Sequence, residues 1–238
     1  MKTSNIGLFI IFGFICMLII VGVVGARVAI GDISDIEGMK SKAEEMGTPW
    51  EREDHQLSGF SEVIVKGSWE LTMVRGRGYN VSVFHKGDAA DLIDVYTRGD
   101  TLYLDAVRAV QAGAYRLKAE VTMPSFTECT IEGACDLEFS GFTEEQLELE
   151  LDGAGRVKGT GNSYKELEIE INGAVQVDML ESTTENAEVN LDGAGKVMLT
   201  MDGGVLAGEI DGLGTVEYAG PVSENSVKVS GFGSVRSR

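Results

Sequence analysis

The sequence has few of the residues on which active sites and small disulfide-bonded domains usually depend. Its 238 residues include two histidines, two tryptophans, three prolines and three cysteines. Because Cys16 lies in an apolar N-terminal stretch, only Cys129 and Cys135 remain for the rest of the chain, which excludes a disulfide framework. A single bridge between them and a pair of buried free thiols both remain open.

Positive charge is also scarce. The chain carries 20 Lys and Arg against 38 Asp and Glu, a formal net charge of −18. A phosphate backbone is bound by clustered Lys and Arg, so this balance argues against a nucleic-acid partner. It argues equally against peripheral docking on anionic lipid.

Sequence motifs for catalysis and cofactor binding are missing. Gly153-Ala154-Gly155 begins like a dinucleotide fingerprint, but a strand is expected after it where that motif needs a helix. Gly195-Lys196 is followed by Val197, where a phosphate-binding loop needs Ser or Thr. His55 and His85 are expected at the surface, and neither has cysteines at metal-ligand spacing. We expect no enzyme, no cofactor and no catalytic residue; the remaining enzymatic alternative is a polysaccharide-active β-helix that uses paired carboxylates.

The N-terminus predicts export across a membrane. Residues 6–26 form an almost unbroken apolar run, long enough to span a bilayer as a helix. Lys2 precedes the run and acidic residues follow it, which places the bulk of the chain outside the cytoplasm. Residues 1–27 are therefore an anchor, or alternatively a cleaved signal segment ending at Val24-Gly25-Ala26. Residues 28–56 are read as a linker, with a short helix expected over residues 32–46.

An internal repeat dominates the second half of the sequence. Glycines spaced 20, 20, 20, 19 and 19 residues apart begin six similar corners, at Gly133, Gly153, Gly173, Gly193, Gly212 and Gly231. So constant a short period is typical of a solenoid, in which each unit buries its apolar face against its neighbours. We predict that these glycines form one column, because a corner this tight leaves no room for a side chain.

Period-two alternation around the corners predicts strands. Leu147, Leu149 and Leu151 point inward, whereas Glu148 and Glu150 point outward. A buried column is expected at Leu151, Ile171, Leu191, Ile210 and Val229. The fold class is thus all-β: a parallel β-helix over residues 57–238 with coils of about 20 residues, following the N-terminal transmembrane helix. Residues 125–238 form its regular repeats; residues 57–124 are either irregular coils of the same solenoid or a separate small sheet packed on its end.

A polar residue precedes each corner glycine. We expect the carboxylates among them to accept backbone N–H groups at their own corners, as Asx-turns do. The alternative is a calcium site in which Asp152, Asp192 and Asp211 supply clustered oxygens.

Three sequence features point together to a known family. They are Gly59-Phe60 followed by Val63-Ile64-Val65-Lys66-Gly67, a strand ending Val121-Thr122-Met123-Pro124, and the serial Gly-Ala-Gly or Gly-Phe-Gly corners. Over about residues 52–238 the chain resembles the bacterial family called putative auto-transporter adhesin, head GIN domain, although its corners are richer in Asp and poorer in Ser than is usual there. The resemblance implies a right-handed, mostly parallel β-helix exported to the cell envelope, and it carries over no catalytic residue.

These observations favour a non-catalytic, adhesin-like binding module of the cell envelope. It would be held by its N-terminal helix, with the domain periplasmic or extracellular, and its partners would be envelope proteins or glycans. The alternative is a self-assembling scaffold, a homo-oligomer formed through the solenoid ends, since such ends expose unpaired strand edges. Phe232, Arg236 and Arg238 would block the C-terminal end only in part.

Overall fold

The computed structural model describes residues 49–111 and 117–238. Residues Trp50–Arg238 form one compact unit. The predicted transmembrane segment at residues 6–26 and the predicted linker helix at residues 32–46 lie outside the described residues. Among the residues that are described, no helix is both long and apolar enough to cross a membrane.

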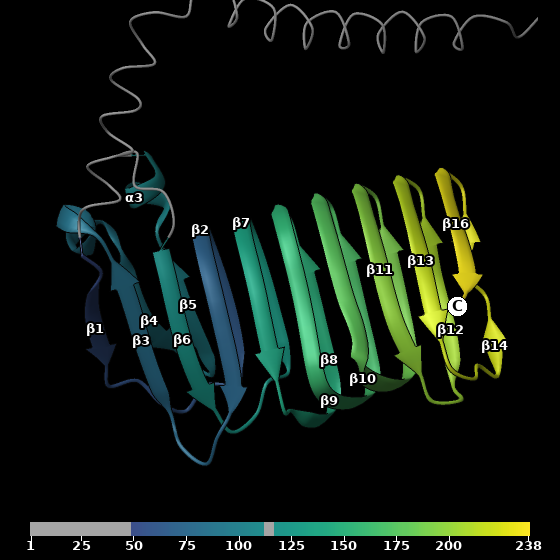
Figure 1. The fold of residues 1–238 in the computed structure, drawn as a ribbon, viewed down its shortest axis with the longest axis horizontal. Helices are drawn as coiled ribbons and strands as arrows, with labels where there is room; N and C mark the ends of the chain where they lie inside the picture. The colour runs from purple at the N-terminus through teal and green to yellow at the C-terminus, as the bar shows by residue number, and fades with distance from the viewer. Residues whose placement is uncertain (1–48, 112–116) are drawn as a thin grey trace, which may run out of the picture. The chain divides into compact units, whose positions relative to one another are not determined.

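Strands dominate this unit and wind into a β-solenoid of about six turns, with successive coils lying side by side (Figure 1). The strands are β1 (Glu51–His55), β2 (Glu62–Arg75), β3 (Asn80–His85), β4 (Asp94–Arg98), β5 (Thr101–Asp105), β6 (Leu117–Met123), β7 (Glu128–Ser140), β8 (Thr143–Leu151), β9 (Ala154–Ile171), β10 (Ala174–Leu191), β11 (Ala194–Met201), β12 (Val205–Ile210), β13 (Leu213–Ala219), β14 (Glu224–Asn225), β15 (Lys228–Val229) and β16 (Phe232–Ser237). The described helices are η1 (Gly87–Leu92) and α3 (Val107–Gln111).

The sequence period is the length of one coil. Strands β9 and β10 pair in parallel from Ala154 with Ala174 to Ile171 with Leu191. The pairings from β7 to β16 are likewise parallel. The strands belong to one continuous sheet that bends at each corner. Segments before each corner glycine are here called the first face, and segments after it the second face. Residues that share a repeat position therefore stand next to one another on the same face.

The core lies between the two faces, where the alternation of the sequence points its apolar side chains. In the predicted buried column, Leu151, Ile171, Leu191 and Ile210 are each at most 1% exposed. The prediction is wrong for Val229, which pairs with Ile210 in register but is 44% exposed. Val229 lies in the last described coil, so no further coil is described that would cover it.

A buried polar ladder fills the bend opposite the glycine corner. Asn162 lies between Phe142 of the preceding coil and Ser182 of the following one, and all three are buried. Its Oδ1 accepts the Phe142 backbone N–H at 3.0 Å, and its Nδ2 donates to Ser182 Oγ at 3.0 Å. Each polar atom thus has a partner, which removes most of the penalty for burying an amide.

The first half joins the same sheet, but not simply as irregular parallel coils. Strand β2 pairs in parallel with β7, and β5 and β6 extend the two faces in the same direction. In contrast, β3 lies antiparallel between β1 and β6, and β4 is antiparallel to β5. The short loop after Arg75 turns the chain back on itself, so the strand that follows it runs in the opposite direction. A purely parallel arrangement of residues 57–124 is therefore wrong.

Candidate functional site

The corner glycines stack in one column that begins earlier than the repeat suggested. Gly67 pairs with Gly133. A Cβ on Gly153, Gly173, Gly193 or Gly212 would lie 1.7–2.0 Å from the carbonyl oxygen of the preceding corner glycine, and one on Gly231 would lie 2.3 Å from that of Gly212. Close approach between backbones therefore excludes a side chain at these corners. A positive φ adds to this at Gly133, where φ is 139°.

Asp192 and Asp211, two of the acidic residues at the corners, do not form the expected Asx-turns. The amides that such turns would use donate instead to the preceding coil: Ala194 to the carbonyl of Gly173, and Leu213 to that of Gly193, each at 2.8 Å. The Asx-turn interpretation is therefore wrong for Asp192 and Asp211. Coil-to-coil pairing already satisfies these donors, so they need no side-chain acceptor.

The residues of the alternative calcium site do not converge. Asn172 separates Asp152 from Asp192 in the column, and its Nδ2 donates to Asp152 Oδ1 at 2.9 Å. Within residues 49–111 and 117–238, no three His, Cys, Asp or Glu side chains are grouped so that they could hold a metal ion. The corner column is thus a line of single carboxylates and amides along one edge of the solenoid.

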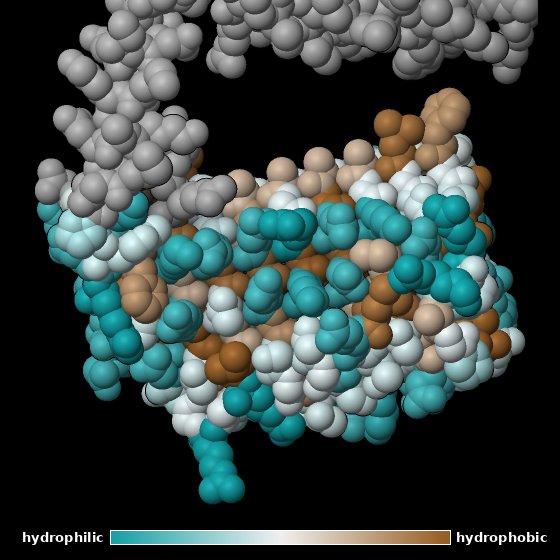
Figure 2. Space-filling model, viewed as in Figure 1, coloured by the Kyte–Doolittle hydropathy of each residue, from teal (hydrophilic) through white to brown (hydrophobic). Residues whose placement is uncertain are grey.

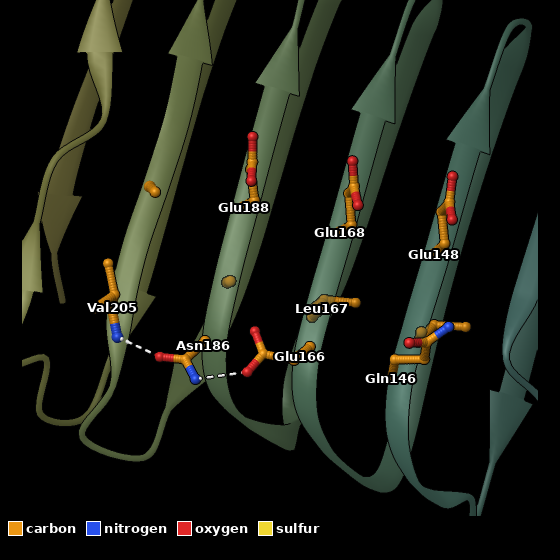
Figure 3. A pocket seen from close by; sticks show the side chains of 11 residues that line it. Gln146, Glu148, Glu166, Leu167, Glu168, Asn186, Glu188 and Val205 are labelled. Carbon is orange, nitrogen blue, oxygen red and sulfur yellow. Dashed lines mark hydrogen bonds between the residues drawn. The ribbon is translucent and has the colours of Figure 1, made fainter.

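The first face carries a column of glutamates that the sequence analysis did not identify. Parallel pairing aligns one glutamate from each of five successive strand segments, here called the glutamate column: Glu62, Glu128, Glu148, Glu168 and Glu188. Figure 3 shows Glu148, Glu168 and Glu188 projecting from neighbouring strands on the same side of the sheet. The signal in the sequence was the spacing of 20 residues from Glu128 to Glu188.

Electrostatic repulsion follows from this alignment. Loss of surrounding water, and then the neighbouring carboxylates Glu148 and Glu188, raise the pKa of Glu168 above its ordinary value. Loss of water, followed by Glu62 and Glu148, raises the pKa of Glu128 in the same way. The first face thus presents a line of negative charge that nearby cations do not fully neutralise.

A shallow groove of about 340 Å³ runs over this column. It is lined by Gln146, Leu147, Glu148, Glu166, Leu167, Glu168, Asn186, Ala187, Glu188, Val205 and Ala207. At one end Asn186 is held in place: its Nδ2 donates to Glu166 at 2.9 Å, and its Oδ1 accepts the Val205 backbone N–H at 2.9 Å (Figure 3). The groove therefore combines amide side chains with carboxylates, of which Glu166 and Glu188 accept hydrogen bonds from Asn186 and Asn190.

The second face has a different charge pattern, because cations stand beside its acids. Arg156 pairs with Asp136 at 3.3 Å, and the nearly buried carboxylate of Glu217 contacts Lys196 and Arg236 at 3.0 Å each. The hydrogen bond from Lys196 is the main reason that the pKa of Glu217 is lowered. Figure 2 shows hydrophilic side chains in rows across the visible side of the unit, with hydrophobic ones between the rows and along one edge.

The residues considered for catalysis are not brought together as a reactive site. His85 is 4% exposed, so its expected surface position is wrong. Cys129 and Cys135 are free and buried, and burial raises the pKa of Cys135 to about 12, which disfavours the reactive thiolate. Gly153-Ala154-Gly155 leads into β9, so no helix is present there to hold a pyrophosphate.

Comparison with known proteins gives a family and a fold. The family model described as putative auto-transporter adhesin, head GIN domain matches residues 59–199, more than half of the chain. No protein with a curated description matches the sequence.

Solved structures share this architecture. A crystal structure titled putative adhesin from Bacteroides fragilis has a TM-score of 0.66 and 15% identity, covering 80% of this chain and 97% of that one. Another putative adhesin, from Parabacteroides distasonis, has a TM-score of 0.50 and 11% identity, covering 80% and 98%. A structure titled putative lipid binding protein, from the same species, has a TM-score of 0.45 and 17% identity, covering 78% and 96%. On the family match, the chain belongs to the putative auto-transporter adhesin, head GIN domain family.

Proposed function

We propose that the protein is a non-catalytic, adhesin-like binding module of the cell envelope. The observation that carries this proposal is the first face, where parallel register places equivalent polar side chains in rows across successive coils. Rows of this kind offer a repeating set of hydrogen-bond acceptors and donors to an extended partner. The family's own description as an adhesin supports the same role.

The geometry of the groove favours binding over catalysis. Hydrolysis of a glycoside uses two carboxyl groups in different environments, so that one is protonated while the other is ionised. Glu148, Glu168 and Glu188 occupy equivalent positions on an open surface, without long loops to enclose a reacting bond. Their uniformity suits repeated contacts with a polymer, and we therefore rank a polysaccharide-active enzyme last.

Display outside the cytoplasmic membrane is part of the proposal, and the apolar run at residues 6–26 supports it. In spheroplasts of cells that produce the full chain, added protease should degrade the unit from Trp50 to Arg238 while cytoplasmic markers survive. Detergent should be needed to extract the uncut chain. A chain that stays protected and is soluble without detergent would contradict this location.

Binding can be tested with the full chain in detergent micelles, incubated with purified cell-wall sacculi and with surface polysaccharide. We expect the native chain to sediment with at least one of these polymers. The same chain unfolded by heat is the matched control, because it keeps the charge and composition but loses the rows of side chains. Equal sedimentation of the native and unfolded chains, or none of either, would contradict a folded binding surface.

The alternative is a self-assembling scaffold, and one observation favours it. Leu213 and Phe232 stand next to each other in register and are 59% and 83% exposed, and they line an open hollow with the adjoining glycines. Exposed apolar groups of this size are suited to contact with a second copy. Light scattering that rises with protein concentration and falls in a Phe232→Ser variant would favour the scaffold; a stable monomer favours the binding module.

A further inference from the structure

A pair of stacked tyrosines lies on the first face near the N-terminal end of the solenoid. Tyr96 of β4 and Tyr103 of β5 are directly opposite each other in the antiparallel hairpin. Their rings are nearly parallel, with an interplanar angle of 3° and centroids 4.8 Å apart. The two rings therefore stand on the sheet face to face, one strand spacing apart.

The outer ring is open on its far side. Tyr103 is half-buried between Tyr96 and the row that continues with Ile64 of β2. Strand β4 pairs only with β5 in the described structure, so no further described strand lies beyond Tyr96. The Tyr96 residue is 43% exposed. The pair thus presents a flat, rigid aromatic surface whose orientation is fixed by the hairpin register.

Polar groups of both signs flank this surface. Residues two positions apart on a strand share a face, so Asp94 and Arg98 project beside Tyr96. Asp94 accepts a hydrogen bond from Arg108 at 2.9 Å. Across the hairpin, Thr101 Oγ1 donates to Glu62 at 2.7 Å, and Lys66 donates to Glu132 at 2.8 Å.

We propose that Tyr96 is the stacking platform for one ring of a neutral saccharide, and that the flanking side chains hydrogen-bond its hydroxyls. This inference rests on the proposed function and names its ligand class and its site. The face of an aromatic ring is electron-rich and attracts the C–H groups on the flat side of a sugar ring. Hydroxyls both donate and accept, so they suit surroundings that contain carboxylates, a guanidinium and an ammonium together.

The same surroundings argue against a cationic ligand. Aromatic sites for ammonium groups gain from nearby acids alone, whereas here the acids Asp94 and Glu132 are already paired with Arg108 and Lys66. The row through Tyr103 and Ile64 continues with Thr130 and Glu150, whose side chains are hydrogen-bonded at 3.3 Å. An oligosaccharide that starts on Tyr96 and crosses the strands would therefore meet further polar groups.

Isothermal titration of the full chain in detergent with cellohexaose, chitohexaose and mannohexaose tests the inference, with spermine as the cationic probe. We expect at least one hexaose to bind, and Tyr96→Ala to weaken that binding about tenfold. Tyr96→Phe keeps the ring and should stay within about twofold of the native affinity. Phe232→Ala removes a more exposed aromatic ring at the other end of the solenoid, 83% exposed against 43% for Tyr96, and should have no effect.

The hairpin pair also contributes to folding, so circular dichroism must show each variant folded at the assay temperature. The inference is overturned if no hexaose binds while the native chain still sediments with envelope polymers, an outcome that leaves the proposed function standing. It is overturned equally by hexaose binding that Tyr96→Ala leaves unchanged, or by spermine binding that depends on Tyr96. Loss of all envelope binding by the native chain would remove the proposed function itself.

Discussion

Replacing Glu168 with glutamine should make the protein more stable at neutral pH. Glu168 stands one strand spacing, about 4.8 Å, from Glu148 and Glu188. Unit charges at that distance repel by about 0.9 kcal/mol each in water. The side chain is exposed and salt screens it, so the net gain for Glu168→Gln should be about 0.5–1.5 kcal/mol in the free energy of unfolding at pH 7.

The pH dependence follows from the raised pKa of Glu168 in the folded protein. Above that pKa, Glu168 is ionised in both states, but its charge is less favourable in the folded state than in the unfolded state. The column therefore lowers the free energy of unfolding. As pH falls through the raised pKa toward the ordinary value of 4.5, the folded state takes up the proton first and stability is recovered. The advantage of Glu168→Gln should therefore shrink as pH falls and disappear below pH 4.5.

Glu138→Gln is the matched control, because it makes the same change at an exposed strand position on the second face. Glu138 pairs in register with Lys158, so its loss should be neutral or cost a few tenths of a kcal/mol. Urea unfolding followed by circular dichroism at pH 7 and pH 4 measures both variants. Equal effects of the two substitutions at pH 7, or a Glu168→Gln gain that persists unchanged at pH 4, would refute the reasoning.

Three other predictions concern the solenoid itself. Gly173→Val should lower the free energy of unfolding by several kcal/mol, because its side chain would collide with the preceding corner. Gly78→Val, at an open position, should change it little, and similar unfolding midpoints for the two variants would contradict the glycine column. Asn162→Ala should cost about 1–3 kcal/mol by leaving buried partners unsatisfied, and a loss below that range in urea unfolding would contradict the polar ladder. Cys129 and Cys135 should react with a thiol reagent only at the rate of unfolding; rapid labelling of the native chain would show that they are accessible.

The repeats were predictable because their two determinants are local in the sequence. Alternation assigns side chains to the inside or the outside, and a glycine every 19 or 20 residues fixes where the chain bends. Together they place Leu151, Ile171, Leu191 and Ile210 in the core. The same logic failed at Val229, since burial there depends on what lies beyond the coil and not on the coil's own pattern.

The site depended on register, which a single repeat does not reveal. Glu148 and Glu168 were recognisable as outward-facing, but only the parallel pairing shows that they are neighbours. Tyr96 and Tyr103 meet because of one hairpin inside the non-repeating part, where no period indicates the partner strand. The burial of Asn162 is likewise invisible in the sequence, because a polar residue in a bend looks like surface until its partners are known.

Because the coils have a nearly constant length, the number of coils, and with it the length of the solenoid, can change in evolution. A unit that contacts only its neighbours can be duplicated or lost as a whole, and the strands on either side can still pair. Each such event would lengthen or shorten the faces by about 4.8 Å and add or remove one position in every row. The antiparallel strands at the N-terminal end are not part of the repeats. The number of contacts offered to an extended partner can therefore change while these strands stay the same.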